Sequence, residues 1–224
     1  MRGAKIGRYW LLAYGLVAAC LIWAAITWRP NVSAYPVQGV DVSEADGEIA
    51  WPTVEAAGAD FAYIKASEGA DVTDPRFVQN WAGTAAAGMR HGAYHLFSLC
   101  RPAADQATNF ISTVPREADA LPAAVRLTLS SGCPSQPDRA ALLRQLKLFI
   151  EMVEAHTGKT VLIAPSPDFE SEYRITGAID RPLWLTGFFI APQYGARPWA
   201  MWQASTFYRV KGIPGGAHWN VIHE

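Results

Sequence analysis

Cysteine and histidine are scarce in this sequence, which has three cysteines and five histidines among 224 residues. The histidines do not combine with the cysteines at the short spacings that structural and catalytic zinc sites use. The sequence therefore predicts no metal site and no other cofactor. The five histidines are His91, His95, His156, His218 and His223.

The sequence also lacks an excess of basic residues. Four of its 19 lysines and arginines lie within the first 29 residues, whereas all 20 acidic residues follow them. The rest of the chain therefore has 15 basic and 20 acidic residues, a formal charge of −5. Nucleic-acid-binding domains need a basic surface, so nucleic acid is not an expected partner.

Charge is missing altogether from residues 9–28, which also contain no proline. An apolar run of about 20 residues spans a bilayer as a helix. Aromatic residues near both ends of the run favour this interpretation, and Arg2, Lys5 and Arg8 before it favour an N-terminus that stays in the cytoplasm. We expect a single-pass protein of the inner (cytoplasmic) membrane. Its parts are a cytoplasmic basic tail (1–8), a transmembrane signal anchor (9–28), a linker (29–36) and an exported domain (37–224).

Two other interpretations of this segment stay open. The tripeptide Val32-Ser33-Ala34 resembles the cleavage site of a signal peptide, although signal peptides have shorter apolar regions of roughly 7–15 residues. The stretch that ends at Cys20 fits a lipoprotein signal, which would be acylated there, but eight further apolar or uncharged residues follow it. Length favours the uncleaved anchor.

Cys100 and Cys133 are the two cysteines outside the apolar run. Cysteine pairs of exported domains form disulfides in oxidising compartments. We therefore expect a disulfide between them, the alternative being two separate buried thiols.

Short apolar runs alternate with amphipathic stretches after the linker. This alternation predicts a parallel sheet, and five such units followed by further strands predict an α/β fold, a modified TIM-like (β/α)5β3 barrel. The expected strands are 37–42, 61–66, 92–97, 123–129, 160–164, 183–186, 199–203 and 219–222. The expected helices are 51–57, 74–87 (with Asp74 as N-cap and Pro75 in the first turn), 103–113 and 138–156.

Ligand sites of such barrels lie at the carboxyl ends of the strands. Asp41 is the candidate reactive residue there, although it also fits a turn cap. The candidate substrate-binding residues are Lys65, Glu68, Tyr94, His95, Trp202 and Gln203. Several of them also have a purely structural interpretation: Lys65 and Glu68 as an ion pair, His95 as a hydrogen-bonded core residue, and Trp202 as core instead of a platform for a sugar ring.

Five short motifs occur in an order typical of one enzyme family. They are Gly39-Val40-Asp41-Val42-Ser43, FAYIKASEG (61–69), Asp74-Pro75-Arg76-Phe77, Gly92-Ala93-Tyr94-His95 and PWAMWQ (198–203). Together they resemble glycoside hydrolase family 25, the Chalaropsis-type lysozymes, over residues 38–222. The resemblance implies a modified β/α barrel that cleaves the β-1,4 bond between N-acetylmuramic acid and N-acetylglucosamine in peptidoglycan.

The resemblance also implies four catalytic carboxylates, and only one of these positions has kept its carboxylate. Asp41 matches the first. After the Leu-Pro-x-x-Val stretch that begins at Leu121, the expected Asp-x-Glu pair is replaced by Arg126 and Thr128. The last expected aspartate is replaced by His218.

Glycoside hydrolysis needs an acid that protonates the leaving oxygen and, in most enzymes, a second carboxylate. A threonine hydroxyl cannot act as that acid, and Arg126 is expected to pair with Asp41 as a salt bridge. We therefore expect an inactive or strongly impaired lysozyme-like domain whose partner is peptidoglycan glycan or a cell-envelope protein. The alternative is an active muramidase that uses Asp41 with a relocated acid such as Glu68 or Glu44.

Overall fold

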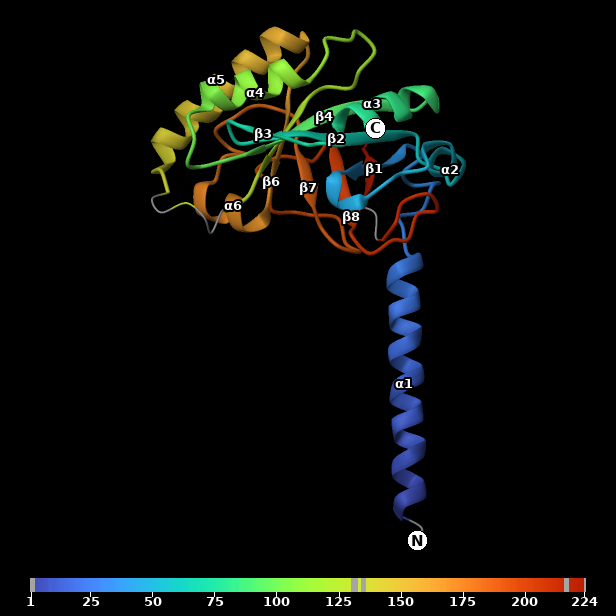
Figure 1. The fold of residues 1–224 in the computed structure, drawn as a ribbon. Coiled ribbons are helices and arrows are strands. Elements are labelled where there is room, and N and C mark those ends of the chain that lie inside the picture. Colours follow the sequence, from blue (N-terminus) through green and yellow to red (C-terminus); the bar gives the residue numbers. More distant parts are fainter. Residues whose placement is uncertain (1–2, 130–132, 134–135, 216–217, 224) are drawn as a thin grey trace.

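The computed structural model describes residues 3–129, 133, 136–215 and 218–223. One long helix, α1 (Gly3–Thr27), projects from a mixed α/β domain (Figure 1). The helix begins before the predicted span, and residues 1–2 of the predicted tail and 224 at the end of the predicted domain lie outside the described residues. Its segment Trp10–Thr27 has a mean hydropathy of 2.0 and is not buried, so it is long and apolar enough to cross a membrane.

The domain is built on one sheet that nearly closes into a barrel. The strands are β1 (Gln38–Val42), β2 (Phe61–Glu68), β3 (Val72–Thr73), β4 (Arg90–Phe97), β5 (Ala124–Leu127), β6 (Leu162–Pro165), β7 (Trp184–Thr186), β8 (Met201–Ser205) and β9 (His218–Ile222). Apart from β3, which pairs only with β2, they lie in the order β6-β5-β4-β2-β1-β9-β8-β7 within the described chain. A parallel bridge between Ile163 and Leu183 joins the two ends of this order.

The sequence predicts β/α units in the first part of the domain and strands without intervening helices in the last part, and the strand directions agree with this prediction. Neighbouring strands are parallel from β1 through β2, β4 and β5 to β6. In contrast, β9 is antiparallel to both β1 and β8. The mixed α/β fold and its barrel-like sheet are therefore confirmed.

Most helices form where the sequence predicts them. The helices after α1 are η1 (Glu44–Asp46), α2 (Trp51–Ala56), α3 (Phe77–Ala86), α4 (Ala103–Thr113), α5 (Arg139–Thr157) and α6 (Pro167–Tyr173) within the described residues. The Asp138 carboxylate caps the start of α5 by accepting from the Ala141 N–H, and Gly158 ends it with a left-handed φ of 71°. Helices α4 and α5 cover the side of the sheet that faces away from α1 (Figure 1).

The predicted start of α3 is wrong. Asp74 does not cap it, and the helix begins at Phe77 with Arg76 as its N-cap. The Asp74 carboxylate instead accepts from the N–H groups of Arg76 and Glu44, so it stabilises a turn and ties it to the loop after β1. Three short elements, η1, β3 and α6, are not predicted because they are too short to show a hydrophobic period.

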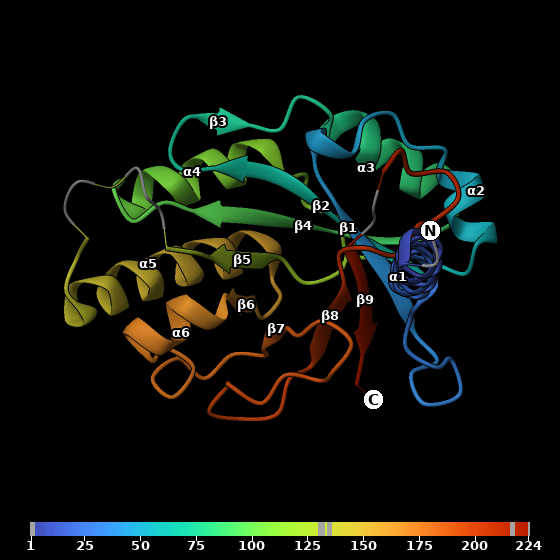
Figure 2. The same cartoon turned by 90° about the horizontal axis from the view of Figure 1, so that it is seen from below.

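Alternate residues of each strand face opposite sides of the sheet. Inside the barrel, Phe61, Tyr63 and Tyr94 form a cluster with Trp184. Their strand neighbours, such as Ile64, belong to the larger core that also contains helix residues. Viewed along α1, β2, β4 and β5 run across the helix direction, with their carboxyl ends pointing away from it (Figure 2).

The segment that follows α1 belongs to the packed domain, although the sequence predicts only a linker. Trp28 and Tyr35 pack on Trp202, which lies on β8 in a small buried cluster with Val221. The Arg29 guanidinium lies 5.4 Å from the ring centroid of Trp219. Residues 28–35 therefore cover the outer face of β8 and β9.

The disulfide between Cys100 and Cys133 is present, as predicted. Cys100 follows β4 and Cys133 lies between β5 and α5, so the bond joins the loops after two neighbouring strands. It closes a loop with a sequence separation of 33 residues.

Replacing both Cys100 and Cys133 by serine is expected to lower the free energy of unfolding by about 3–4 kcal/mol, because a cross-link over this loop length removes entropy from the unfolded chain. Urea titration of the full chain in detergent, followed by tryptophan fluorescence, measures the change. Cys20→Ser, at an exposed cysteine of α1, is the control and should leave the midpoint unchanged. Equal midpoints for all three proteins would contradict the prediction.

Candidate functional site

The candidate site is centred on Asp41 near the end of β1. Its carboxylate is fully buried and forms an ion pair with Arg126, 2.8 Å from Oδ2 to Nη2. Oδ2 also lies 2.9 Å from His218 Nδ1, and Oδ1 accepts from Asn220 Nδ2 at 2.8 Å. The expected ion pair of Asp41 with Arg126 is therefore present, and β1, β5 and β9 together hold the carboxylate.

Strand register explains why these groups meet. Asp41 and His218 are paired residues of the antiparallel β1–β9 ladder, so their side chains leave the sheet side by side. Asn220 lies two residues further along β9 and therefore faces the same side. Its amide oxygen accepts from Trp184 Nε1 at 2.9 Å, which connects the carboxylate to β7.

Arg126 lies against two aromatic rings that meet edge to face. Its guanidinium carbon is 4.8 Å from the ring centroid of Tyr94 and 4.4 Å from that of Trp184. Its Nη2 also donates to Gln203 Oε1 at 2.7 Å. Guanidinium groups are attracted to aromatic faces and to carboxylates at once, so Arg126 connects β4, β7 and β8 to Asp41.

The remaining predicted residues on this side differ in exposure: the Lys65 side chain is 13% exposed and that of Glu68 is 43% exposed. Lys65 donates to Glu68 at 2.7 Å, forming the ion pair that was one of the two interpretations of these residues. Lys65 is also the register partner of Tyr94 across β2 and β4. Thr128 is exposed just after β5.

His95 lies apart from this group, in the core between β4 and the helices. It is fully buried, bonded to Ser67 Oγ at 2.8 Å and Gln106 Oε1 at 3.2 Å, and stacked on Phe149. Burial lowers the pKa of His95 to about 4, so the ring is neutral at pH 7. This position does not support the predicted substrate-binding role and agrees with the structural interpretation of His95.

Trp202 is also turned away from Asp41. Its indole N–H donates to Gly187 O at 2.6 Å, and its ring packs on Tyr35 and Trp28. The next residue, Gln203, faces the barrel interior because strand neighbours point to opposite sides. A platform for a sugar ring is therefore not formed by Trp202, which is a core residue here.

The sequence profile described as "Glycosyl hydrolases family 25" matches residues 40–213, from within β1 to the loop that precedes β9. The chain belongs to glycosyl hydrolase family 25. The resemblance found from the five motifs is therefore confirmed.

Individual relatives agree with this assignment. The chain is 33% identical over 196 residues to "Lysozyme M1" of Streptomyces globisporus, covering 80% of this chain and 65% of that protein. It is 29% identical over 197 residues to "Uncharacterized protein YegX" of Escherichia coli K12, covering 85% of this chain and 71% of that protein.

Solved structures give the same result. A family 25 glycosyl hydrolase from Bacillus anthracis superposes with a TM-score of 0.79 at 30% identity, covering 87% of this chain and 92% of that one. A bacterial lysozyme from Streptomyces coelicolor gives a TM-score of 0.77 at 29% identity, covering 84% and 92%.

The charges around Asp41 favour its ionised form. Burial alone raises the pKa of this carboxyl group, but the Arg126 charge, the His218 charge and the hydrogen bonds from His218 and Asn220 outweigh it, so the pKa lies below its ordinary value. Conversely, the negative charge of Asp41 raises the pKa of His218, with burial and Arg126 opposing it. Both partners are therefore stabilised in their charged forms.

Three residues of this site were not among the predicted ones: Trp184, Asn220 and Asp46. The first two face the barrel interior, and strand alternation relative to Asp41 and His218 is the signal that could have identified them. Asp46, in η1, accepts from the Ser43 N–H at 2.8 Å. Burial raises the pKa of Asp46, with the Ser43 hydrogen bond opposing it, and no sequence pattern indicates this.

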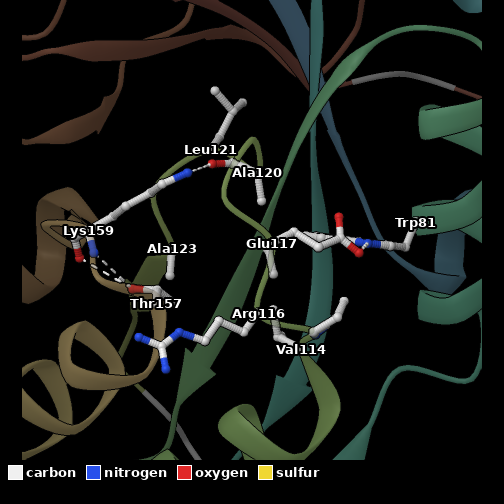
Figure 3. A pocket seen from close by; sticks show the side chains of 11 residues that line it. Trp81, Val114, Arg116, Glu117, Ala120, Leu121, Ala123, Thr157 and Lys159 are labelled. Carbon is white, nitrogen blue, oxygen red and sulfur yellow. Dashed lines mark hydrogen bonds between the residues drawn. The ribbon is translucent and has the colours of Figure 1, made fainter.

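A separate cavity lies at the opposite end of the barrel, near the amino ends of β5 and β6 (Figure 3). Its volume is about 10 Å³, roughly the space of one water molecule. Glu117 accepts from the Trp81 indole, and Lys159 donates to the carbonyl oxygens of Ala118 and Ala120. These contacts lie near the amino ends of the strands, the end of such barrels that serves stability instead of chemistry.

The His218–Asp41 contact predicts a specific pH dependence. The folded-state pKa of His218 is raised, so its stabilising contribution is full below its unfolded pKa of about 6.5 and is lost as pH rises through the folded value. The depressed pKa of Asp41 means that its contribution is present above about pH 4 and is lost at lower pH. The stability difference between wild type and His218→Gln should therefore be largest between about pH 5 and 6.

Urea midpoints of the two proteins at pH 5.5 and 8.5 measure this difference, and an NMR titration of His218 gives its pKa directly. His156→Gln is the control, because its ring bonds a backbone carbonyl of Val114 and no carboxylate. A His218→Gln effect that grows with rising pH would contradict the sign of the shift.

Proposed function

We propose that this chain is a membrane-anchored lysozyme-like protein that binds peptidoglycan glycan strands and has lost most or all muramidase turnover. The observation that carries the proposal is the ion pair between the buried Asp41 and Arg126. The carboxylate that the resemblance marks as catalytic is engaged on both oxygens by Arg126, His218 and Asn220.

The proposed loss of turnover rests on the chemistry of the reaction. A glycosidase protonates the leaving oxygen with a carboxylic acid and stabilises an oxocarbenium-like transition state. At the positions of the Asp-x-Glu pair stand Arg126 and Thr128, neither of which donates a proton near neutral pH. Loss of a general acid removes roughly 10²–10⁴ in rate. The positive charge of Arg126 beside a developing cation adds to this loss.

Peptidoglycan binding without cleavage is supported by the retained barrel and its polar rim. Among the predicted binding residues, Tyr94 and Gln203 contact Arg126 inside the barrel, and Lys65, the register partner of Tyr94, forms an ion pair with Glu68. We assign these four residues to glycan contact. A cell-envelope protein is the alternative partner for the same surface.

An active muramidase with a relocated acid is the second candidate function. Glu68 is already engaged by the Lys65 ammonium group, and Glu44 is exposed. One observation favours a different residue, Asp46, because burial raises its pKa, as a general acid requires, and the charges of Asp41 and His218 act on it.

The decisive prediction is the turnover of the unmodified protein. The full-length wild type should sediment with purified peptidoglycan yet release no reducing ends above the background of a heat-treated sample. The combined change Arg126→Asp, Thr128→Glu and His218→Asp restores the missing carboxylates and should give measurable release. Its rate should stay well below that of an active lysozyme, because the surrounding side chains are not matched to catalysis.

Robust cleavage by the wild type, abolished by Asp41→Asn with the fold intact by circular dichroism, would overturn the proposed loss of turnover. Glu68→Gln, Glu44→Gln and Asp46→Asn, assayed in the same way, would then identify the acid. If the wild type released reducing ends but did not sediment with peptidoglycan, stable glycan binding would be contradicted as well.

The membrane anchor makes its own prediction. If α1 is an uncleaved anchor, the full-length chain stays in the membrane pellet after an alkaline wash, and protease added to spheroplasts digests the domain from outside. Intact-mass analysis should show the complete N-terminal segment. A mature N-terminus at Tyr35, or an acyl group on Cys20, would contradict it in favour of a signal peptide or a lipoprotein.

A further inference from the structure

An exposed apolar patch lies beside the end of α1. It consists of Phe188, Phe189 and Ile190 after β7, and Phe207 after β8, all of them exposed large side chains. The Phe207 ring packs on both phenylalanines, at centroid distances of 5.7 and 6.2 Å. The Phe189 ring also packs at 5.0 Å on Trp28, the residue that follows α1.

The backbone holds this patch in place at a conformational cost. Phe189 has a φ of 65°, a left-handed conformation that bulky residues rarely adopt. Its N–H donates to Ala204 O at 3.1 Å, which fixes the loop to β8. Strain of this kind persists only where the surrounding structure enforces it, yet here it keeps an aromatic ring in solvent.

The loop that carries Phe207 is basic. Residues 181–223 contain no aspartate or glutamate, and of their four basic residues Arg181 and Arg197 pair with Glu154 and Asp180, which leaves Arg209 and Lys211 beside the patch. Arg209 and Lys211 are exposed in the loop that carries Phe207. The Arg209 N–H donates to Ile26 O at 2.9 Å, so this loop is bonded directly to the last turn of α1. Exposed basic residues close to a membrane are attracted to anionic lipid.

We propose that the apolar patch inserts into the headgroup region of the bilayer that α1 crosses, so that the barrel is docked on the membrane and not suspended above it. The inference rests on the proposed anchor. Lipid is the occupant that fits, because the patch is continuous with an apolar helix, is aromatic and is flanked by basic residues. Aromatic side chains are enriched at this level of membranes, and apolar surfaces with basic borders bind there.

Docking fixes the orientation of the candidate site. Strands β2, β4 and β5 run across the direction of α1, and their carboxyl ends point away from the helix (Figure 2). The barrel mouth near Asp41 then opens along the membrane surface. A glycan bound there would lie beside the bilayer.

The test uses the full-length chain with Cys20→Ser, reconstituted in vesicles of phosphatidylethanolamine and phosphatidylglycerol. A nitroxide label is attached at Ile190→Cys or at the matched control Val78→Cys. The two side chains are equally exposed, 76% and 77%, but Val78 lies on α3. A third label at Leu16→Cys reports insertion of α1. Collision rates with oxygen, which concentrates in lipid, and with a water-soluble nickel complex give the depth of each label.

The label at position 190 should show a severalfold higher ratio of oxygen to nickel collisions than the label at position 78. Equal ratios at 190 and 78, with a bilayer signal at 16, would overturn the docking while leaving the anchor intact. Shielding of position 190 from both reagents would also overturn it, because a second copy or another protein would then cover the patch. An aqueous signal at position 16 would overturn the anchor and the docking together.

Discussion

A carboxylate without solvent contact needs positive charge and hydrogen-bond donors close by, and Asp41 imposes this requirement on the centre of the barrel. Removing one partner of a buried ion pair typically costs about 3–5 kcal/mol, because the other charge stays buried and unpaired. Arg126 supplies the countercharge, and His218 and Asn220 occupy the remaining acceptor positions. The requirement extends to further strands, since the guanidinium of Arg126 in turn lies against the rings of Tyr94 and Trp184. One buried charge thus determines side chains on five of the strands.

The donors around Asp41 also bear on the proposed loss of glycosidase turnover. An aspartate in a glycosidase site is useful when its charge is free to respond to the sugar. Here two strands, β5 and β9, bring three donors to it, so the ionised form is stabilised before any ligand arrives. In the proposed function, the barrel architecture is kept and the charges at its centre bind one another instead of a sugar. Arg126 is half-buried there, and its guanidinium lies against the rings of Tyr94 and Trp184.

The sequence predicts the strands, the disulfide and the family, because these depend on patterns that neighbouring residues share. It does not predict which of two adjacent residues faces the site. Tyr94 and His95 are both proposed from one motif, and so are Trp202 and Gln203, but consecutive strand residues point to opposite sides. Only one of each pair lies near Asp41: Tyr94 and Gln203 contact Arg126. The alternation of strand residues is visible in the sequence. Which of the two alternating sets faces the barrel interior depends on the pairing with neighbouring strands, and no local sequence pattern contains that pairing.

The linker shows a second limit of local patterns. Residues 29–36 have two prolines and no clear period, which is typical of a spacer. Their role depends on the sheet residues that they contact. Trp202 on β8 and Val221 on β9 face outward, and Trp28 and Tyr35 cover them. An exposed tryptophan face on the sheet is disfavoured by the hydrophobic effect, so the chain leaving α1 completes the core. The helix therefore joins the domain through packed side chains, and these contacts relate the direction of α1 to the direction of the barrel.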